Sequence, residues 1–359
     1  MKKIMFVIGC LSGGGAERVV TSVASALAEK GFIVSILTYY EAEGEYYYSP
    51  KINRINISNG GIVDFNKMSI FDKIKRIRKN IKNEKPDEII CFLPHPLVYT
   101  YFSCLFSKYK KRISYAVRAN PKKENDLISK IQQKLCYKVK KIITQNKGQA
   151  NCFSKRLQKK IVVIPNPMYD ELFETQKEYS TTVKNIVSVG RLTDQKNYEL
   201  SINAMKIICD KYSNINYYIY GNGPLENRIN TLIKEKKLEK RVFIMGFERN
   251  RNKIYDDKDI FIMTSKFEGM PNALAEAMCK GIPSISTNCE FGPSDLILNA
   301  NMGILLDDFK VETLVNALEK VVNNYDEYVI KAKNAREILK KKYSFDKIMK
   351  KWIYMLENN

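Results

Sequence analysis

Short apolar runs alternate with segments of helical periodicity along this chain, and no other feature limits its possible folds as strongly. The first run is Ile4–Ile8, and three glycines precede the segment that follows it. That segment places apolar residues at helical spacing, at Val19, Val20, Val23 and Leu27. Gly31 marks the expected end of this helix, and Ile33–Leu37 is the next apolar run. A strand, a helix and a second strand in this order predict a doubly wound parallel sheet.

The same alternation predicts two domains. In the first half, further strands are expected at Glu88–Leu93, Ile113–Val117, Lys141–Thr144 and Ile161–Ile164. Pro165-Asn166-Pro167 then interrupts the pattern, and a polar stretch follows. The alternation restarts with strands at Asn185–Val189, Asn216–Tyr220, Val242–Met245, Ile260–Met263 and Ile282–Ser286, and with helices over Tyr198–Tyr212 and Ala273–Cys279. A chain of 359 residues is long enough for two domains of ordinary size.

We therefore expect an α/β protein with two Rossmann-like, doubly wound domains that face each other across a cleft. The boundaries place the first domain at residues 1–168 and the second at 169–343. Residues 344–359 are amphipathic, with Ile348, Trp352 and Met355 along one side. This tail should form a helix that packs back on the first domain.

The charge balance is strongly basic. Lys and Arg number 60 against 39 Asp and Glu, a formal net charge of +21. Such an excess attracts nucleic acid, an anionic membrane surface or a phosphorylated substrate. Three basic runs, Lys108–Arg112, Lys138–Lys141 and Lys155–Lys160, lie in the first half and favour one basic face. Part of the lysine content also fits the composition bias of an AT-rich genome, so both interpretations remain open.

The cysteines and the single histidine argue against a zinc site. The eight cysteines are scattered, none forms a C-x-x-C pair, and the only histidine is His95. The start of the chain has too short an apolar run for a signal peptide. No stretch approaches roughly 18 uninterrupted apolar residues, the length that a membrane span needs. We expect a cytoplasmic protein that docks at most on the inner face of the cytoplasmic membrane.

The first candidate site is the glycine-rich turn Ser12-Gly13-Gly14-Gly15 between the first strand and its helix. Gly14 and Gly15 let the backbone approach a ligand, and the following helix N-terminus offers N–H groups to an anion. The alternative is a tight turn with no ligand. The turn lacks the G-x-G-x-x-G fingerprint, and the chain contains no G-x-x-x-x-G-K-[ST], so a dehydrogenase and a P-loop NTPase are disfavoured.

The second candidate site is the loop Gly190–Asn197, directly after the first strand of the second domain. Arg191 and Lys196 can converge on one diphosphate, where Arg makes bidentate contacts and Lys supplies a compact charge. Two fixed cations would stabilise the charge that builds on a departing phosphate. The alternative is a pair of solvated surface cations.

The third candidate site is the segment Phe267–Met278, which follows the expected strand Ile260–Met263. The backbone of Gly269, Met270, Pro271, Asn272, Ala273 and Leu274 can form an anion cradle at a helix start. Glu268 can accept hydrogen bonds from sugar hydroxyls. Glu276 lies in an otherwise apolar helix, where a carboxylate is costly unless bonded, and a ribose diol is a suitable donor. The alternative is two ordinary surface glutamates.

The segments SGGGAERVV, VGRLTDQKN and FEGMPNALAEAM, in this order, resemble the retaining glycosyltransferases of family 4, with the GT-B architecture. The resemblance covers nearly the whole chain, and its most specific part is the E-x7-E pair of Glu268 and Glu276. It implies an acceptor-side first domain and a nucleotide-sugar-binding second domain. It implies that Arg191 and Lys196 bind the donor diphosphate, that Glu268 and the backbone of 269–271 hold the sugar, and that Glu276 holds the ribose.

Three residues of the first domain are further candidates. His95 follows an expected strand, and relatives often place a donor-sugar or acceptor contact there; the alternative is a loop histidine held by two prolines. Arg118 and Asn120 also follow a strand and could contact the acceptor or the pyrophosphate, or merely cap the strand end.

The resemblance implies catalysis without a metal, and we expect no cofactor beyond a nucleotide-sugar co-substrate, with UDP the expected nucleotide. Asp257-Lys258-Asp259 matches the D-x-D letters of metal-dependent enzymes, but it precedes an expected buried strand and we interpret it as a polar strand entrance. The predicted function is transfer of a hexose or N-acetylhexosamine to an undecaprenyl-diphosphate-linked or growing surface glycan. A UDP-sugar 2-epimerase of the same fold is the alternative. A nucleic-acid-binding protein is a remote one, because no recognition helix or RNP motif is found.

Overall fold

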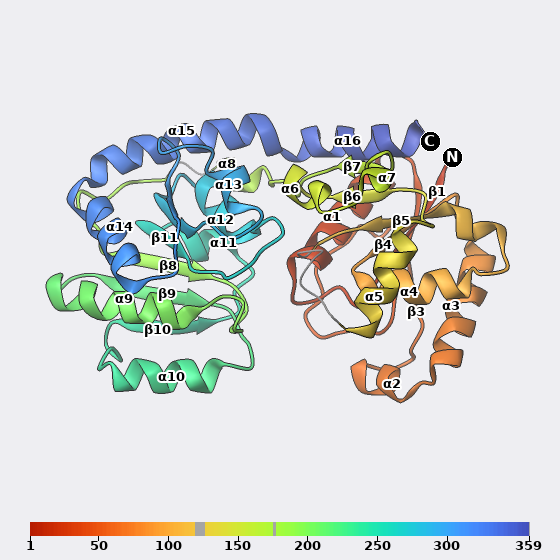
Figure 1. The fold of residues 1–359 in the computed structure, drawn as a ribbon, viewed down its shortest axis with the longest axis horizontal. Helices are drawn as coiled ribbons and strands as arrows, with labels where there is room; N and C mark the ends of the chain where they lie inside the picture. The colour runs from red at the N-terminus through yellow and green to blue at the C-terminus, as the bar shows by residue number, and fades with distance from the viewer. Residues whose placement is uncertain (119–125, 175–176, 359) are drawn as a thin grey trace. The chain divides into compact units, whose positions relative to one another are not determined.

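The computed structural model describes residues 1–118, 126–174 and 177–358. The chain divides into two compact units, Met1–Asn166 with Ile348–Asn359, and Pro167–Lys347. Each unit contains one parallel sheet covered by helices (Figure 1). The prediction of two doubly wound parallel sheets is therefore confirmed.

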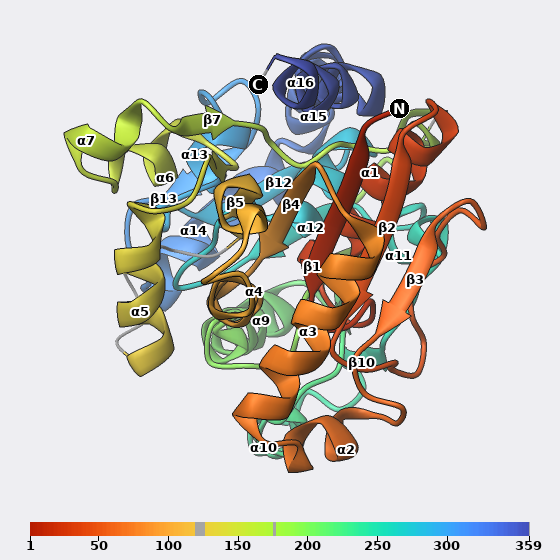
Figure 2. The same ribbon diagram turned by 90° about the vertical axis from the view of Figure 1, so that its right-hand side faces the viewer.

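The sheet of the first unit has seven parallel strands in the order β3-β2-β1-β4-β5-β6-β7. The strands are β1 (Lys3–Ile8), β2 (Ile33–Thr38), β3 (Asn53–Asn56), β4 (Glu88–Phe92), β5 (Ile113–Ala116), β6 (Ile142–Thr144) and β7 (Ile161–Val163). The helices are α1 (Gly15–Glu29), α2 (Ile62–Lys67), α3 (Ile70–Glu84), α4 (Pro94–Ser103), the 3-10 helix η1 (Lys108–Arg112), α5 (Leu127–Cys136), α6 (Lys147–Asn151) and α7 (Lys155–Gln158). Helices α3 and α4 lie over one face of the sheet (Figure 2).

Alternation along each strand divides the core of the first unit between two faces. Met5 and Cys91 face the cluster formed with α3 and α4. Phe6 and Phe92 point the other way and meet Trp352, whose ring centroid lies 6.4 Å from each of theirs. Trp352 is fully buried. The C-terminal helix α16 (Phe345–Glu357) therefore supplies part of this core.

The sheet of the second unit has six parallel strands in the order β10-β9-β8-β11-β12-β13. The strands are β8 (Asn185–Val189), β9 (Asn216–Tyr220), β10 (Val242–Gly246), β11 (Ile260–Met263), β12 (Ser284–Thr287) and β13 (Ile304–Leu306). The helices are α8 (Glu171–Glu174), α9 (Tyr198–Lys211), α10 (Glu226–Glu235), α11 (Arg251–Tyr255), α12 (Asn272–Cys279), α13 (Pro293–Leu296), α14 (Val311–Asn323) and α15 (Tyr325–Tyr343). Ile186, Ile260 and Ile285 of neighbouring strands belong to one core cluster.

The first unit ends at Asn166, two residues before the expected boundary at residue 168. The Met168 N–H donates to the Tyr343 carbonyl over 2.8 Å, which ties the segment after Asn166 to the second unit. The Phe345 ring lies tilted against that of Tyr169, with 5.8 Å between the ring centroids. The second unit thus extends to Lys347, whereas the sequence placed its end at 343.

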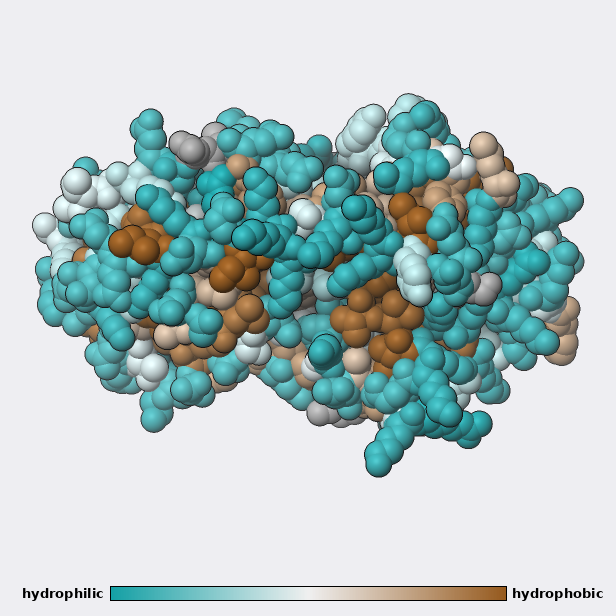
Figure 3. All heavy atoms as spheres, turned by 90° about the horizontal axis from the view of Figure 1, so that it is seen from above, coloured by the Kyte–Doolittle hydropathy of each residue, from teal (hydrophilic) through white to brown (hydrophobic). Residues whose placement is uncertain are grey.

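Two edge strands are absent from the sequence-based expectation. β3 has the sequence NRIN and is nowhere fully buried, so it lacks the apolar run that marks a central strand. β13 has only three residues. Among the residues that the structure describes, no helix has the length and apolar character needed to cross a membrane. Hydrophilic side chains cover most of the face in Figure 3.

Candidate active site

The backbone of the loop after β8 packs against the segment Gly221–Gly223, which follows β9. The Gly190 N–H donates to the Tyr220 carbonyl and the Leu192 N–H to the Asn222 carbonyl, each over 2.9 Å. A Cβ at Gly221 would lie 2.0 Å from the Gly190 oxygen, and one at Gly223 would lie 2.4 Å from the Leu192 oxygen. The Gly221-x-Gly223 sequence therefore lets two backbones meet, which holds the loop that carries Arg191 and Lys196.

Lys196 and Glu268, two of the predicted site residues, form an ion pair. Lys196 Nζ lies 2.6 Å from Glu268 Oε1, and both side chains are largely buried. Asn197 takes a left-handed conformation with φ of 51°, and the Thr264 hydroxyl donates to the carbonyls of Lys196 and Asn197. The loops after β8 and β11 come together because these strands are neighbours in the sheet.

Further hydrogen bonds fasten the two loops to each other. The Gln195 side-chain amide donates to the Phe267 carbonyl, and the Lys266 N–H donates to the Gln195 carbonyl, each over 2.8 Å. Gln195 and Thr264 were not singled out in the sequence. Their side chains bond backbone carbonyls, a role that residue type alone does not reveal. The site thus has a backbone frame that depends on both loops.

Helix α12 begins directly after the candidate anion cradle. Pro271 stands at its N-cap position and Asn272 is its first residue. Proline has no side-chain acceptor for the first N–H groups, so the residue before the helix does not cap it. The positive end of the helix therefore supports binding of an anion next to Glu268.

Glu276 lies within α12 and is 4% exposed. Arg251 Nε lies 3.0 Å from its Oε2, and the Tyr255 hydroxyl donates to the same oxygen over 3.1 Å. Both partners come from α11, and the sequence analysis missed them. The sequence analysis expected this buried carboxylate to need hydrogen-bond partners, and the protein itself supplies two of them.

The same two helices carry a second charged contact. Lys280, one turn after Glu276, is buried and donates to Asn252 over 2.6 Å and to Asp256 over 3.0 Å. Glu276 and Lys280 lie four residues apart on the α12 side, and the two partners of each lie four residues apart on the α11 side, so one face of α11 meets one face of α12. This i, i+4 spacing is the sequence signal that could have identified Arg251.

Arg191 differs from Lys196 in its surroundings. Its side chain is exposed, and it forms no ion pair with any residue that the structure describes. The guanidinium at the carboxyl end of β8 is thus available to a ligand without loss of an internal contact. Gly190, Arg191 and Lys196 occupy one loop, and Glu268 reaches that loop through Lys196.

Gly292, directly before α13, packs against the backbone of the candidate anion cradle. A Cβ at Gly292 would lie 2.4 Å from Pro271 Cδ and 2.9 Å from the Gly269 oxygen, and its φ is +94°. Cys289 lies near the same loops, and burial, with a smaller effect of Glu268, raises its pKa to about 12. This thiol is therefore protonated at neutral pH.

Replacing Gly292 by alanine should destabilise the second unit more than replacing Gly246. Both glycines have positive φ, but a Cβ at Gly246 would meet only Asn222 Oδ1, at 3.5 Å. The clash at Gly292 should therefore add about 2 kcal/mol to the cost shared by both variants. Urea unfolding of the two variants measures this difference, and equal losses would contradict the clash.

In the first unit, the glycine-rich turn leads into α1 as expected. Gly13 has φ of +85°, and α1 begins at Gly15. Glu17 fills the space beside Gly14, where a Cβ would lie 2.1 Å from its Oε2. A carboxylate at this helix N-terminus already complements the helix dipole, which weakens the case for an anion at Gly14 and Gly15.

His95 lies in the first turn of α4 rather than in a loop. It is exposed, and its ring centroid is 6.3 Å from that of Tyr99. Leu93, just before the helix, has φ of 73°, a strained conformation for a residue with a side chain. The strain sets the direction in which the chain leaves β4 and thereby the position of His95.

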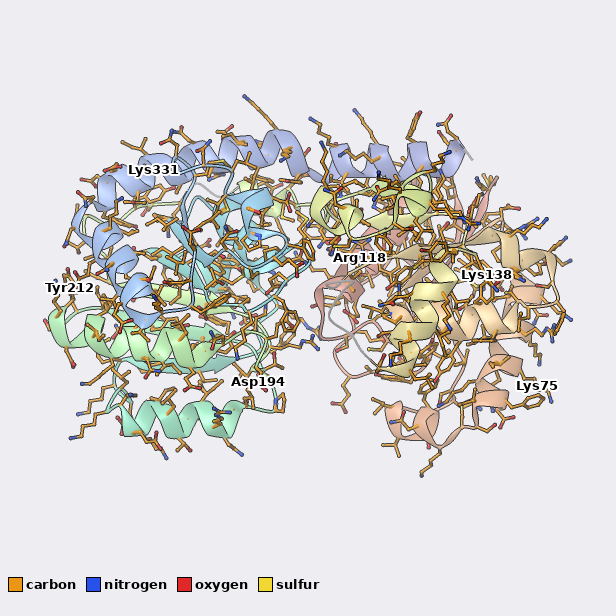
Figure 4. The ribbon with its side chains drawn as sticks, in the orientation of Figure 1. Lys75, Arg118, Lys138, Asp194, Tyr212 and Lys331 are labelled. Atoms are coloured by element: carbon orange, nitrogen blue, oxygen red, sulfur yellow. The ribbon has the colours of Figure 1, made fainter. Side chains whose placement is uncertain are left out.

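Arg118 lies beyond the carboxyl end of β5 (Figure 4). Its Nη1 donates to Asn166 Oδ1 over 2.7 Å, and its guanidinium lies 4.6 Å from the Phe92 ring centroid. Its Nε and Nη2 have no hydrogen-bond partner in the described part of the chain. Burial lowers the pKa of Arg118 to about 9, so it stays charged at neutral pH. Unsatisfied N–H donors on a cation are suited to binding a phosphate. Asn120, the other candidate after β5, lies outside the described residues.

The D-x-D-like sequence serves the fold. Asp259 is 5% exposed and accepts the N–H groups of Lys184 and Asn185 over 2.7 and 2.8 Å. Asp257 forms an ion pair with the buried Lys258. These contacts tie the entrance of β11 to that of β8, which agrees with the interpretation as a strand entrance.

Two family models together match residues 13–338. Glycosyltransferase Family 4 matches residues 13–171, and Glycosyl transferases group 1 matches residues 170–338. The chain belongs to the GT-B glycosyltransferases. The group 1 match contains the Lys196–Glu268 pair and the buried Glu276.

Relatives of this glycosyltransferase match it from end to end. An uncharacterized glycosyltransferase of Haemophilus influenzae is 25% identical over 98% of this chain and 99% of its own. An undecaprenol-linked glycan N-acetyl-D-galactosaminyltransferase of Campylobacter jejuni is 26% identical over 99% of this chain and 98% of its own. Anabaena HepE, solved in complex with UDP-glucose, is 15% identical with a TM-score of 0.83 and covers all of both chains, which indicates the shared fold.

Proposed function

We propose that this glycosyltransferase moves a hexose or N-acetylhexosamine from a UDP-sugar to a lipid-linked or growing surface glycan, with retention of the anomeric configuration. The observation that carries the proposal is the Lys196–Glu268 pair, which joins a cation loop and a helix N-terminus at the ends of two neighbouring strands. The buried Glu276 lies on the helix that begins there. The Campylobacter relative acts on an undecaprenol-linked glycan, which supports the class of acceptor.

The proposed roles follow from the chemistry of the side chains. Arg191 and Lys196 neutralise the diphosphate as the bond from the anomeric carbon to its phosphate oxygen breaks. Glu268 orients the sugar hydroxyls, and Glu276 accepts hydrogen bonds from the ribose. The acceptor hydroxyl attacks from the face that the phosphate leaves, and a donor phosphate oxygen takes its proton. The cations supply the charge stabilisation that a metal supplies in other enzymes.

Two residues of the first unit are assigned to the acceptor side. Two donors of Arg118 have no hydrogen-bond partner among the described residues, and His95 is an exposed ring at the same edge of the sheet. An acceptor linked through a diphosphate would match the Arg118 charge. The enzyme would then act at the inner face of the cytoplasmic membrane, peripherally bound to an anionic surface.

A direct transfer assay tests this function. The full chain is incubated with radiolabelled UDP-sugars and a bacterial lipid extract, and the linkage of the product is read by NMR. The expected product has the anomeric configuration of the donor, and an inverted product would refute retention. A 2-epimer formed from UDP-N-acetylglucosamine alone would identify an epimerase.

Chelation provides a further expected result. Because Arg191 and Lys196 carry the charge stabilisation, excess EDTA should leave the transfer rate within about twofold of the untreated enzyme. Initial rates with and without EDTA, each repeated after addition of Mg²⁺, measure this. A rate that falls with EDTA and recovers with Mg²⁺ would contradict catalysis without a metal.

A further inference from the structure

Two residues of α11 hold one oxygen of the buried Glu276 carboxylate. Arg251 Nε lies 3.0 Å from Glu276 Oε2, and the Tyr255 hydroxyl donates to the same oxygen over 3.1 Å. The last torsion of a glutamate side chain is broad, so the packing of α12 alone does not fix the direction of the carboxylate. Two contacts that converge on Oε2 fix that direction, and the position of the second oxygen, Oε1, follows from it.

Burial strengthens both contacts. The side chains of Arg251 and Glu276 are 13% and 5% exposed, and Tyr255 is fully buried. Water therefore screens this ion pair little, and a carboxylate at this depth needs the counter-charge that the guanidinium supplies. The Tyr255 hydroxyl also lies 3.3 Å from the Ala273 carbonyl, in the first turn of α12. Buried groups of the protein thus hold the carboxylate before a ligand binds.

Helix α11 is attached to the unit by other contacts as well. Asn250, the residue before the helix, accepts the Asn252 N–H over 3.0 Å and thereby caps it. Near the other end of the helix, Asp256 pairs with Lys280 of α12 over 3.0 Å. These contacts do not involve Glu276, so α11 should stay on α12 when the contacts to Oε2 are removed. Orientation of the carboxylate and docking of the helix can therefore be tested separately.

We propose that Arg251 and Tyr255 are positioning residues that make the second unit select a ribonucleotide. By holding Oε2 they direct the Glu276 carboxylate at the two hydroxyls of a ribose, and they act through Glu276 rather than by contact with the ligand. An acceptor held in its binding direction gives a tighter complex than one that must be ordered on binding. The inference rests on the proposed function, in which Glu276 accepts hydrogen bonds from the ribose of the donor.

Calorimetric titration of the full chain with UDP and with 2′-deoxy-UDP tests the inference, because the deoxyribose offers one donor fewer. The wild type should bind UDP about tenfold more tightly, which is the value of one hydrogen bond to a charged group. Arg251→Gln and Tyr255→Phe should each lower this ratio to about threefold, and the double variant should abolish it. Arg251→Lys keeps the charge but not the planar guanidinium, so it should recover the melting temperature more than the ratio.

The ratio separates positioning from stability, since a general loss of stability weakens the binding of both nucleotides equally. Asp256→Asn is the control, because it removes the neighbouring ion pair between the same two helices. It should keep the wild-type ratio. A tenfold ratio in Arg251→Gln would overturn the positioning role and leave the ribose contact in place. An equal loss of the ratio in Asp256→Asn would overturn it in favour of helix docking.

Failure of the proposed function gives a different result. A wild-type enzyme that binds the two nucleotides equally would refute the ribose contact of Glu276, and the role of its two partners with it. The transfer assay is read independently of this titration. Glycosyl transfer by an enzyme with equal nucleotide binding would therefore retain the transferase and overturn only the assignment of Glu276 and its partners.

Discussion

Replacing Glu276 by alanine is expected to lower kcat/KM for the donor about a thousandfold and to reduce the free energy of unfolding by about 3 kcal/mol. The loss of activity follows from the proposed charged hydrogen bonds of Glu276 to the ribose, each worth about 1.5–3 kcal/mol. The loss of stability follows because Arg251 and Tyr255 would lose the carboxylate to which they bond. A buried cation without its partner is strongly destabilising.

Two further variants separate these effects. Glu276→Gln keeps the shape and one acceptor oxygen, so it should regain part of the stability and little of the activity. Asp256→Asn removes the Lys280 ion pair between the same helices, α11 and α12, and leaves Glu276 untouched. It should keep donor turnover within about threefold. Initial rates below each melting temperature are the measurement, and equal activity in Glu276→Ala and the wild type would refute the ribose contact.

Replacing Arg191 by alanine is expected to lower kcat about a hundredfold and leave the melting temperature unchanged. The side chain is exposed and makes no ion pair in the described part of the chain, so the fold loses nothing. In the proposed mechanism the leaving diphosphate loses a fixed cation, and loss of one such stabilising group typically costs a hundredfold or more in rate. Activity and stability are thus predicted to separate at this residue.

The control is Arg228→Ala, also in the second unit. Arg228 is exposed and pairs with Glu199 at the surface over 3.2 Å, so its removal should change neither rate nor stability measurably. A fall in melting temperature for Arg191→Ala would indicate a structural role. Unchanged kcat with unchanged stability would show that the diphosphate does not contact Arg191.

The fold was largely predictable because a parallel strand leaves a local signature. Central strands buried on both faces read as apolar runs, and β8, β9 and β11 have the bounds that their runs predict. The edge strands β3, with the sequence NRIN, and β13, with three residues, lack that signature and escaped, whereas the edge strands β7 and β10 carry apolar runs and were expected. The unit boundary also shifted, because the bond from Met168 to Tyr343 joins residues far apart in the sequence.

The candidate site was predictable in part for the same reason. Arg191, Lys196 and Glu268 lie in loops that follow apolar strands, where a parallel sheet presents ligand-binding groups, and Glu276 lies in the helix after the second of these loops. Their spacing along the chain carries that information. The spacing does not show which of these side chains contact one another. It also does not show that Arg251 pairs with Glu276.

Local periodicity thus specified the helices, the strands and the residues at the strand ends. Contacts between these ends depended on strand order, since hydrogen bonds that place β8 beside β11 and β5 beside β6 join segments distant in the chain. The Lys196–Glu268 pair exists through that order. The local sequence pattern determines which side chains of a strand or helix face the core. The order and packing of the strands in the whole sheet determine which other side chain each of them contacts.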